Sequence, residues 1–400
     1  LQAADDLPLL RVVVIQVHGA EDTAGDASNS KNGNSVGDDT DNGTDSTDNT
    51  NTTENTDTND TKGPTELPSD KMADSSGWVW KLQGTEGDYV LTFAYEGEGD
   101  APKLEIPDAF VESIHETLVK DDMQSAITTL ILPDGVTKVG KNAFTNLPAL
   151  KQVSLPASLE EMGESVFDSS AALTDVTIKE GSALKKIGAG CFSGCTAMTT
   201  LDLSGTQIES IPDNLCSGCE NLTTVKLPST VNTISASAFS NCPNLQSVNL
   251  QDTQITTVPA NMFAGCTKLS SVAFPATLTS IGESAFSGCT GLTSADFSAA
   301  AGLTSIDKNA FANSGLTSVT LPDALNSIGD NAFAGCPNLQ SASLPALVYY
   351  SSTGTLGAGV FSNCPAMAEV TYRPVDGRSF QTAGKNFYLP ENTFQGDTAL

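Results

Sequence analysis

The chain has 400 residues, with 48 Asp and Glu against 19 Lys and Arg, which gives a formal net charge of −29. This balance argues against nucleic acids and anionic membrane surfaces as partners, because both are bound through clustered Lys and Arg. No apolar run approaches the ~18 residues that a membrane-spanning helix requires, so we expect no membrane insertion.

Residues 1–20 contain one strand-like apolar run, Arg11 to Val17, which we interpret as the remnant of a preceding domain. The chain has no starting Met, and Leu400 falls where a new repeat would begin. We therefore expect a fragment of a longer protein, truncated at the C-terminus.

Residues 21–76 consist mostly of Asp, Asn, Thr, Ser and Gly, as in "GDDTDNGTDSTDNTNTTENTDTNDTKGPTE". Such a segment buries too little apolar surface to offset its chain entropy, which predicts a disordered acidic linker. Calcium binding through the Asp and Asn oxygens is the alternative, but the Asp-x-Asp-x-Asp-Gly spacing of a dedicated loop is missing.

Residues 77–126 change character. The alternation in "GWVWKLQGTEGDYVLTFAYEGEG" predicts a β-hairpin, and "KLEIPDAFVESIHETLVKDDM" favours a short helix. A repeat array has an apolar end that needs cover, so we predict that this segment is the N-terminal cap of the array that follows.

Residues 127–400 form the array. "LSSVAFPATLTSIGESAFSGCTG" from Leu269 and "LTSVTLPDALNSIGDNAFAGCPN" from Leu316 share their apolar positions, central glycine and closing cysteine, while most polar positions differ. We count about eleven units of roughly 23 to 25 residues, the last ones being longer. The units begin at Ile127, Leu150, Leu173, Met198, Leu222, Leu245, Leu269, Leu292, Leu316, Leu339 and Met367.

Each unit follows the pattern L-x-x-V-x-L-P-x-x-L-x-x-I-G-x-x-A-F-x-x-C. The first part suits a short strand ended by proline, and Ile-Gly suits a second extended piece with a bend. Ala-Phe is expected to begin one turn of helix or 3-10 helix. One unit has too few apolar side chains to offset the entropy cost of its own ordering, so the units must stack and share a core. The recurring aromatic is Phe144, Phe167, Phe192, Phe239, Phe263, Phe286, Phe311, Phe333, Phe361 and Phe394.

The frame of "LTSVTLPDALNSIGDNAFAGCPN" resembles the repeat of the BspA-type leucine-rich repeat family, which has "L-P…I-G…A-F…C" in place of an asparagine ladder. The resemblance covers residues 127–400. It implies an α/β repeat solenoid, a right-handed leucine-rich-repeat superhelix. One face would be a parallel β-sheet, and the other side would hold short helical, 3-10 or extended turns. It also implies secreted or cell-surface proteins of bacteria and protists, often assigned to adhesion.

Nine cysteines allow three interpretations. "CFSGC" and "CSGC" could be metal or redox pairs, or neighbouring rungs could be joined by disulfides. No histidine or second pair accompanies those motifs, and stacked side chains point in parallel rather than at each other. We favour buried thiols that act as small hydrophobes. Cys191 and Cys216 stand at the Ala and Phe positions, and the closing column holds Cys195, Cys219, Cys242, Cys266, Cys289, Cys336 and Cys364.

The only histidines, His18 and His115, lie outside the array, which excludes a Ser-His-Asp or Cys-His arrangement within it. No glycine-rich phosphate loop is present, since the glycines recur at turns. We therefore predict no catalytic residue, no cofactor and no metal site, and a protein that is not an enzyme.

Positions 3 and 5 of each unit flank the buried Val and should point outward from the sheet. They are small hydroxyl residues with occasional charges and no aromatics, which suits weak multivalent contact with a ligand or mere solubility. The candidate residues are Gln152, Ser154, Asp175, Thr177, Thr200, Asp202, Thr224, Lys226, Ser247, Asn249, Ser271, Ser294, Asp296, Ser318, Thr320, Ser341, Ser343, Glu369 and Thr371.

A second candidate contact is the insertion "ALVYYSSTGTLGAGV", because loops carry function and Tyr349 and Tyr350 could anchor an interface. An ordinary packed loop is the alternative.

We hypothesise a non-enzymatic adhesion or binding module, extracellular at the cell surface or secreted, whose partners are protein or glycan ligands on host or neighbouring cells. The alternatives are a structural spacer that presents a domain outside this chain, or enzyme activity confined to missing regions.

Overall fold

The computed structural model describes residues 69–72, 76–85, 87–114, 123–345, 355–373 and 393–396, all within one compact unit. The strand-like run in residues 1–20, most of the linker over residues 21–76, and residues 346–354 of the insertion, including Tyr349 and Tyr350, lie outside the described residues.

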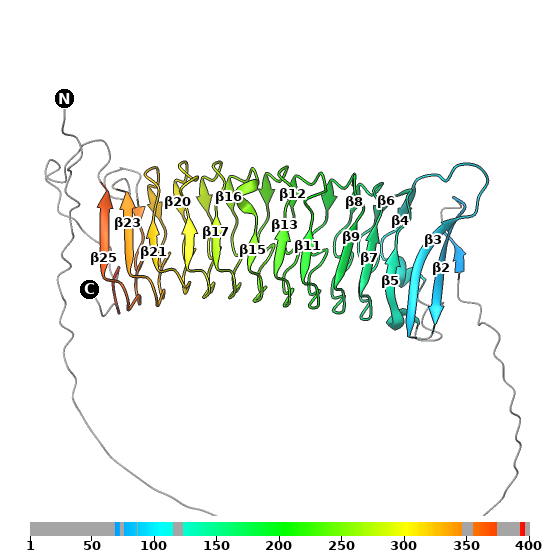
Figure 1. Cartoon of the computed structure of the whole chain (residues 1–400), viewed down its shortest axis with the longest axis horizontal. Coiled ribbons are helices and arrows are strands. Elements are labelled where there is room, and N and C mark those ends of the chain that lie inside the picture. The colour runs from blue at the N-terminus through cyan, green and yellow to red at the C-terminus, as the bar shows by residue number, and fades with distance from the viewer. Residues whose placement is uncertain are drawn as a thin grey trace, which may run out of the picture. The chain divides into compact units, whose positions relative to one another are not determined.

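An antiparallel hairpin precedes the array. Strand β2 (Trp78–Thr85) pairs with β3 (Asp88–Tyr95) along its whole length, and β1 (Ser69–Lys71) pairs with the other side of β2. Strand β3 pairs in parallel with β5 (Ile127–Ile131), which is the first strand of the array. The hairpin therefore continues the sheet of the array at its N-terminal end, as Figure 1 shows.

Between the hairpin and β5 lie three short elements: β4 (Leu104–Ile106), the helix α1 (Phe110–Ser113) and the 3-10 helix η1 (Met123–Ala126). The ring of Phe110 lies 5.3 Å from Phe93 of the hairpin and 6.0 Å from Phe144 of the first unit, measured between ring centroids. The first phenylalanine of the array thus has an aromatic neighbour on its N-terminal side.

The first parallel sheet takes one strand from each unit, and we call its solvent-facing side the first face. It is interrupted between β9 and β11, between β15 and β17, and between β19 and β21. After β5 its strands are β7 (Gln152–Leu155), β9 (Asp175–Ile178), β11 (Thr200–Asp202), β13 (Thr224–Lys226), β15 (Ser247–Val248), β17 (Ser271–Ala273), β19 (Ser294–Asp296), β21 (Ser318–Thr320), β23 (Ser341–Pro345) and β25 (Glu369–Arg373).

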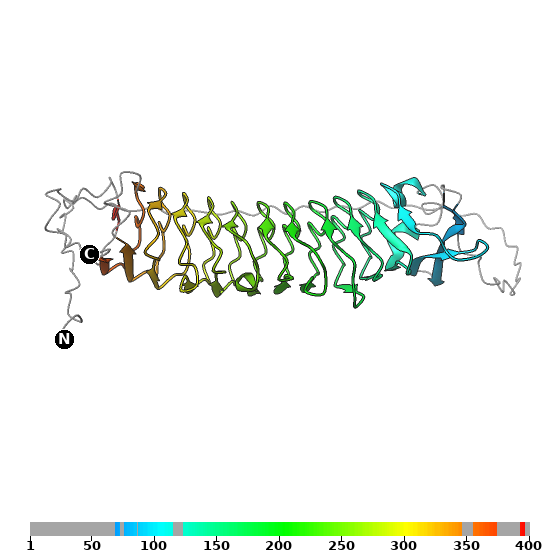
Figure 2. The same ribbon diagram turned by 90° about the horizontal axis from the view of Figure 1, so that it is seen from above.

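A second parallel ladder is formed by the Ile-Gly part of each unit, and we call its outer side the second face. Figures 1 and 2 show both sets of strands stacked along the array. Along the chain, the 3-10 helix η2 (Leu250–Asp252) lies between β15 of the first sheet and β16 of the second ladder. After β4 the strands are β6 (Val136–Val139), β8 (Glu161–Met162), β10 (Lys186–Ile187), β12 (Ser210–Ile211), β14 (Thr233–Ile234), β16 (Thr257–Val258), β18 (Ser280–Ile281), β20 (Ser305–Ile306), β22 (Ser327–Ile328) and β24 (Thr355–Leu356).

The third side of each rung is a pair of turns around the Ala-Phe position, so the extended-turn alternative describes the array better than a helical turn. Ser284 and Gly288 flank Phe286 with φ values of 55° and 73°. The backbone N–H groups of Ser284, Phe286 and Gly288 donate to the carbonyls of Lys308, Ala310 and Ala312 in the next rung, over 3.0, 2.7 and 2.9 Å. Most of these left-handed positions hold Gly or Asn, the residues that adopt positive φ most readily, and a few hold Ser. The turns pair rung to rung as strands do.

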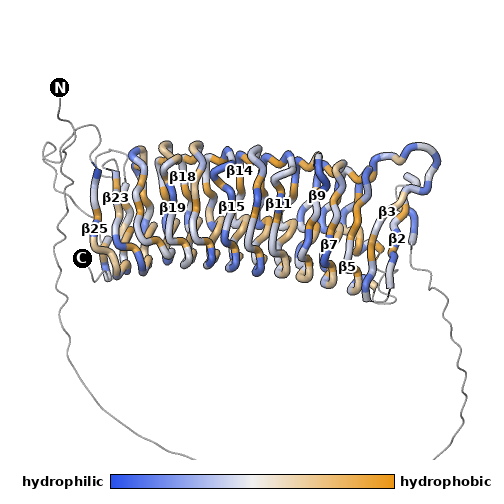
Figure 3. Tube along the Cα trace, viewed as in Figure 1, coloured by the Kyte–Doolittle hydropathy of each residue, from blue (hydrophilic) through white to orange (hydrophobic). Residues whose placement is uncertain are grey.

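The phenylalanine column forms the shared core. The rings of Phe286, Phe311 and Phe333 are completely buried, with centroids 4.9 and 5.2 Å apart and nearly parallel planes. Figure 3 shows hydrophobic residues recurring from rung to rung along the array. The column is broken where Cys216 replaces the aromatic ring, and that thiol is also buried. The predicted repeat solenoid with a parallel sheet and a continuous core is confirmed.

Candidate binding surface

The predicted outward residues do lie on the first face. Each of them is exposed or half-buried, whereas the residues between them, such as Leu201 and Val225, are buried. Strand register aligns Thr200, Thr224 and Ser247 side by side in successive rungs. The first face therefore carries two columns of small polar side chains.

Several of these side chains are already engaged within the array. Asp202 forms an ion pair with Lys226 in the next rung, with 2.8 Å between Oδ2 and Nζ. The side-chain amide of Asn249 accepts the N–H of Leu227 over 2.8 Å and donates to the Leu227 carbonyl over 3.1 Å. Asn249 thus replaces backbone pairing where β15 ends, and its amide is less available to a ligand than the sequence suggested.

A depression of about 610 Å³ interrupts the first face between β19 and β21. Leu292 to Ile306 spans 14 positions (306 − 292), whereas Leu316 to Ile328 spans 12 (328 − 316), because a Ser-Ala-Ala-Ala-Gly loop replaces the usual Pro-x-x segment. The longer loop accompanies the loss of strand pairing between β19 and β21. Four predicted residues line the depression, namely Ser294, Asp296, Ser318 and Thr320.

Arg373 forms one wall of this depression, and it was not among the predicted residues. Its guanidinium reaches back over two rungs: Nη1 donates to the carbonyl and Oγ of Ser343 over 3.2 and 2.7 Å, and Nη2 donates to the Leu321 carbonyl and the Asp323 carboxylate. The sequence carries one signal for it, since Arg373 occupies the position that is Pro322 in an earlier unit.

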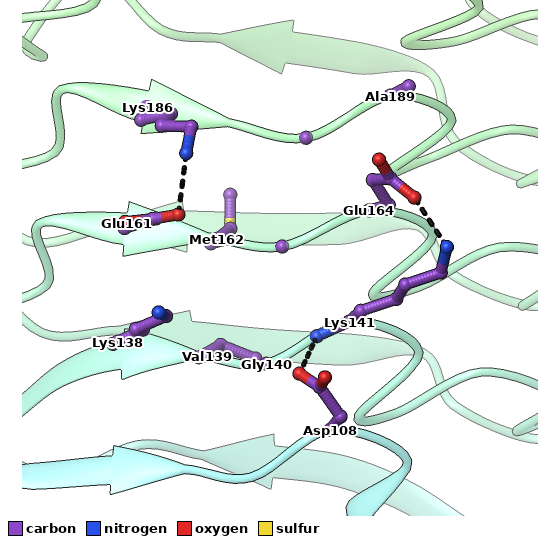
Figure 4. Close-up of a pocket in the computed structure, with 12 residues that line it drawn as sticks. Asp108, Lys138, Val139, Gly140, Lys141, Glu161, Met162, Glu164, Lys186 and Ala189 are labelled. Atoms are coloured by element: carbon purple, nitrogen blue, oxygen red, sulfur yellow. Dashed lines mark hydrogen bonds and ion pairs between the residues drawn. The ribbon is translucent and has the colours of Figure 1, made fainter.

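A second depression, of about 500 Å³, lies on the second face across β6, β8 and β10 (Figure 4). Ion pairs between neighbouring rungs cross it: Lys186 Nζ lies 2.8 Å from Glu161, and Lys141 Nζ lies 2.6 Å from Glu164. The hydrogen bond from Lys186 holds the pKa of Glu161 below its ordinary value, and the bond to Glu164 raises the pKa of Lys141. Because these charges neutralise each other, the depression is a lattice of ion pairs rather than a charged ligand site.

Gly140, Gly163 and Gly188 also line this second depression. A Cβ built at Gly188 would collide with the backbone N of Glu164 and the carbonyl carbon of Gly163. The glycine column is therefore required by the close approach of successive rungs.

Replacing Gly188 with alanine is expected to lower the free energy of unfolding by about 1–3 kcal/mol, because backbone of the preceding rung must shift. Gly205→Ala is the matched control, since no atom lies within 4 Å of a Cβ at that position. Thermal or denaturant unfolding of the two variants checks this, and equal stability would contradict the packing role of the glycine column.

All nine cysteines are buried thiols. In the closing column each thiol reaches the preceding rung: Cys266 Sγ donates to the Phe239 carbonyl over 3.2 Å, and Cys289 Sγ donates to the Phe263 carbonyl over 3.1 Å. Burial raises the pKa of Cys191 and Cys289 to about 12 from an ordinary value of 9.0. The closing-column thiols therefore link rungs as weak donors, and Cys191 and Cys289 stay protonated at neutral pH, which agrees with the interpretation as buried thiols.

In the part of the chain that the structure describes, no cluster of three or more His, Cys, Asp or Glu residues is placed to hold a metal ion. Within the same residues, no helix has the length and apolar character needed to cross a bilayer.

Comparison with solved structures found similar leucine-rich repeat proteins from bacteria. A leucine-rich repeat protein from Bacteroides ovatus is 23% identical, with 74% of this chain and 70% of that chain covered and a TM-score of 0.54. A leucine-rich repeat protein from Eubacterium ventriosum is 18% identical, covers 83% of this chain and 95% of its own, and has a TM-score of 0.45. A leucine rich cell surface protein from Faecalibacterium prausnitzii is 21% identical, with 76% and 95% covered and a TM-score of 0.36.

Comparison with curated proteins found no match. The family model described as "BspA type Leucine rich repeat region (6 copies)" matches residues 122–246, 185–302 and 256–387. These matches overlap and together run from residue 122 to residue 387, well over half of the chain. The chain therefore belongs to the BspA-type leucine-rich repeat family.

Proposed function

We propose that this chain is a non-enzymatic binding module that acts outside the cell, secreted or at the cell surface, through its first face. The observation that carries the proposal is the pair of polar columns, which run in register within each segment of the first sheet with their side chains at the surface. Family membership and the named cell-surface protein of similar architecture support the location.

The chemistry of the first face favours many weak contacts over one strong one. Its side chains are mostly Ser and Thr, and Ile131 is the only large hydrophobic residue strongly exposed among the described residues. Strong interface hot spots use buried Trp, Tyr and Arg, so each rung contributes little and affinity must come from several rungs at once. The net charge of −29 steers the module away from anionic ligands and toward neutral or cationic protein and glycan surfaces.

A structural spacer is the second candidate function, and one observation favours it. Side chains such as Asp202, Lys226 and Asn249 bond within the array, so part of the first face serves stability. The domain boundaries predicted from the sequence, the linker over residues 21–76 and the contact role of Tyr349 and Tyr350 stay predictions.

The test uses the full 400-residue chain on arrays of matrix proteins, cell-surface proteins and glycans. Replacing Thr200, Thr224 and Ser247 together with lysine should abolish binding to the immobilised ligand that retains the unmodified chain. The matched control places three lysines on the second face, at Ser210, Thr233 and Thr257, and should leave retention unchanged. Failure of every array to retain the unmodified chain would overturn the binding proposal in favour of the spacer.

A further inference from the structure

The depression between β19 and β21 differs chemically from the rest of the first face. One bank carries the Asp296 carboxylate, and the other carries Asp323 beside Arg373. Ser318 and Thr320 line the depression from β21. The depression therefore offers two acceptor groups and neighbouring hydroxyls around one hollow, where other rungs present a flat surface.

The shape of the Asp296 bank is set by its loop. The Oδ1 of Asp296 accepts the backbone N–H of Ser298 over 2.8 Å, which fixes the carboxylate at the start of the longer loop. Hydrogen bonds from Ser298 also hold the pKa of Asp296 below its ordinary value, so the group is ionised at neutral pH. Asp296 is exposed, and a carboxylate has about four acceptor positions, so it retains acceptor capacity for a ligand.

On the opposite side of the depression, the charge of Arg373 is engaged by neighbouring groups of the array. The Arg373 donors are occupied by Ser343, Leu321 and Asp323, and only 27% of its side chain is exposed. The Asp323 side chain is 75% exposed and accepts from Arg373 at one oxygen, Oδ1. Arg373 thus orients a second acceptor across the hollow from Asp296 instead of attracting anions.

These features narrow the class of ligand. Anionic ligands are disfavoured, because the exposed carboxylates and the chain charge of −29 repel them. Large apolar anchors are disfavoured as well, since Phe297 beneath the depression is only 5% exposed. A neutral ligand rich in hydroxyls can donate to both carboxylates, and the volume of about 610 Å³ falls within the range of small-molecule sites.

We propose that this depression binds a neutral oligosaccharide, with Asp296 and Asp323 accepting hydrogen bonds from sugar hydroxyls and the hydroxyls of Ser318 and Thr320 completing the site. The inference rests on the proposed function, because it names a ligand for the first face. It goes further in naming one irregular unit that adds a localised sugar site to the weak contacts of the regular columns.

The probes are three neutral trisaccharides, namely cellotriose, mannotriose and triacetylchitotriose, and saturation-transfer NMR with the full chain detects weak binding. At least one is expected to bind in the millimolar range, and Asp296→Ala should weaken it at least tenfold because a charge-assisted acceptor is lost. The matched control is Asp330→Ala. Asp330 is likewise exposed and accepts one backbone N–H, from Ala358 over 2.7 Å, on the turn side of the array. This control should bind as the unmodified chain does.

Asp296→Asn is a second variant of the same residue. Its amide oxygen can keep the hydrogen bond from the Ser298 N–H, so this variant should weaken sugar binding while leaving the melting temperature unchanged. Absence of a signal from all three sugars at about 10 mM, or equal binding by the Asp296 variants, overturns the inference. Asp296-dependent binding of a lysine-rich peptide without sugar binding overturns it in favour of a cationic ligand. A third outcome separates the two proposals: the chain is retained on a ligand array and the first-face lysines abolish that retention, but no sugar binds. This outcome supports the proposed function and rejects the oligosaccharide site.

Discussion

Replacing Phe311 with alanine is expected to lower the free energy of unfolding by about 3–5 kcal/mol. The ring is completely buried and stacked on both sides, with centroids 4.9 Å from Phe286 and 5.2 Å from Phe333. Its removal leaves a cavity that two neighbouring rungs share, and neither rung can close it without breaking its own hydrogen bonds. Denaturant unfolding followed by circular dichroism measures the change.

Phe394→Ala is the control for this prediction. Phe394 has one stacking partner among the described residues, Phe361 at 6.0 Å, and is only partly buried. Its replacement should cost clearly less than that of Phe311. Equal effects at the two positions would show that the rings act independently, which a shared core does not allow.

Raising the pH above 9 is expected to destabilise the array steeply. The ordinary cysteine pKa is 9.0, and burial raises that of Cys191 and Cys289 to about 12. Below pH 9 both folded and unfolded chains keep these protons, so the full stability is present. Between about pH 9 and 12 the unfolded chain loses them while the folded chain does not. Each of these two thiols then removes up to about 1.4 kcal/mol per pH unit.

The control removes thiols at positions that accept other residues. Alanine is the usual residue at the position of Cys191, and Ser314 occupies the column of Cys289 in a neighbouring unit. In the double variant Cys191→Ala and Cys289→Ser, the number of protons released on unfolding between pH 8 and 10.5 should be lower by up to about two. The free energy of unfolding should therefore fall less steeply with pH. An unchanged slope would mean that lysine titration, rather than the thiol column, governs alkaline unfolding.

The buried positions could be predicted from the sequence because they repeat. The repeat period of the sequence alone predicted that Phe286 and Phe333 are buried and that Ser318 and Thr320 are exposed, because every unit must match its neighbours. The turn side was less clear, because Ala-Phe is compatible with a helical turn. The deciding signal is the residue with positive φ on either side, such as Asn309 and Asn313 around Phe311.

The features that break the repeat could not be predicted. Arg373 reaches Asp323, fifty positions away in sequence (373 − 323), and only stacking brings the two together. The depression beside Asp296 arises where the longer loop of its unit lies next to a unit of ordinary length. This arrangement depends on how neighbouring units pack. The amide of Asn249 resembles an outward contact in the pattern, yet it completes the backbone pairing of Leu227.

Hydrogen exchange at the turn side tests the shared core most directly. The backbone N–H groups of Phe286, Phe311 and Phe333 donate to carbonyls of the next rung over 2.7, 2.7 and 2.9 Å. If rungs hold one another, these amides exchange only through global or near-global opening, and protection rises from the ends of the array to its middle. Exchange of these three amides as fast as that of exposed loop amides would show that the rungs do not form one cooperative stack.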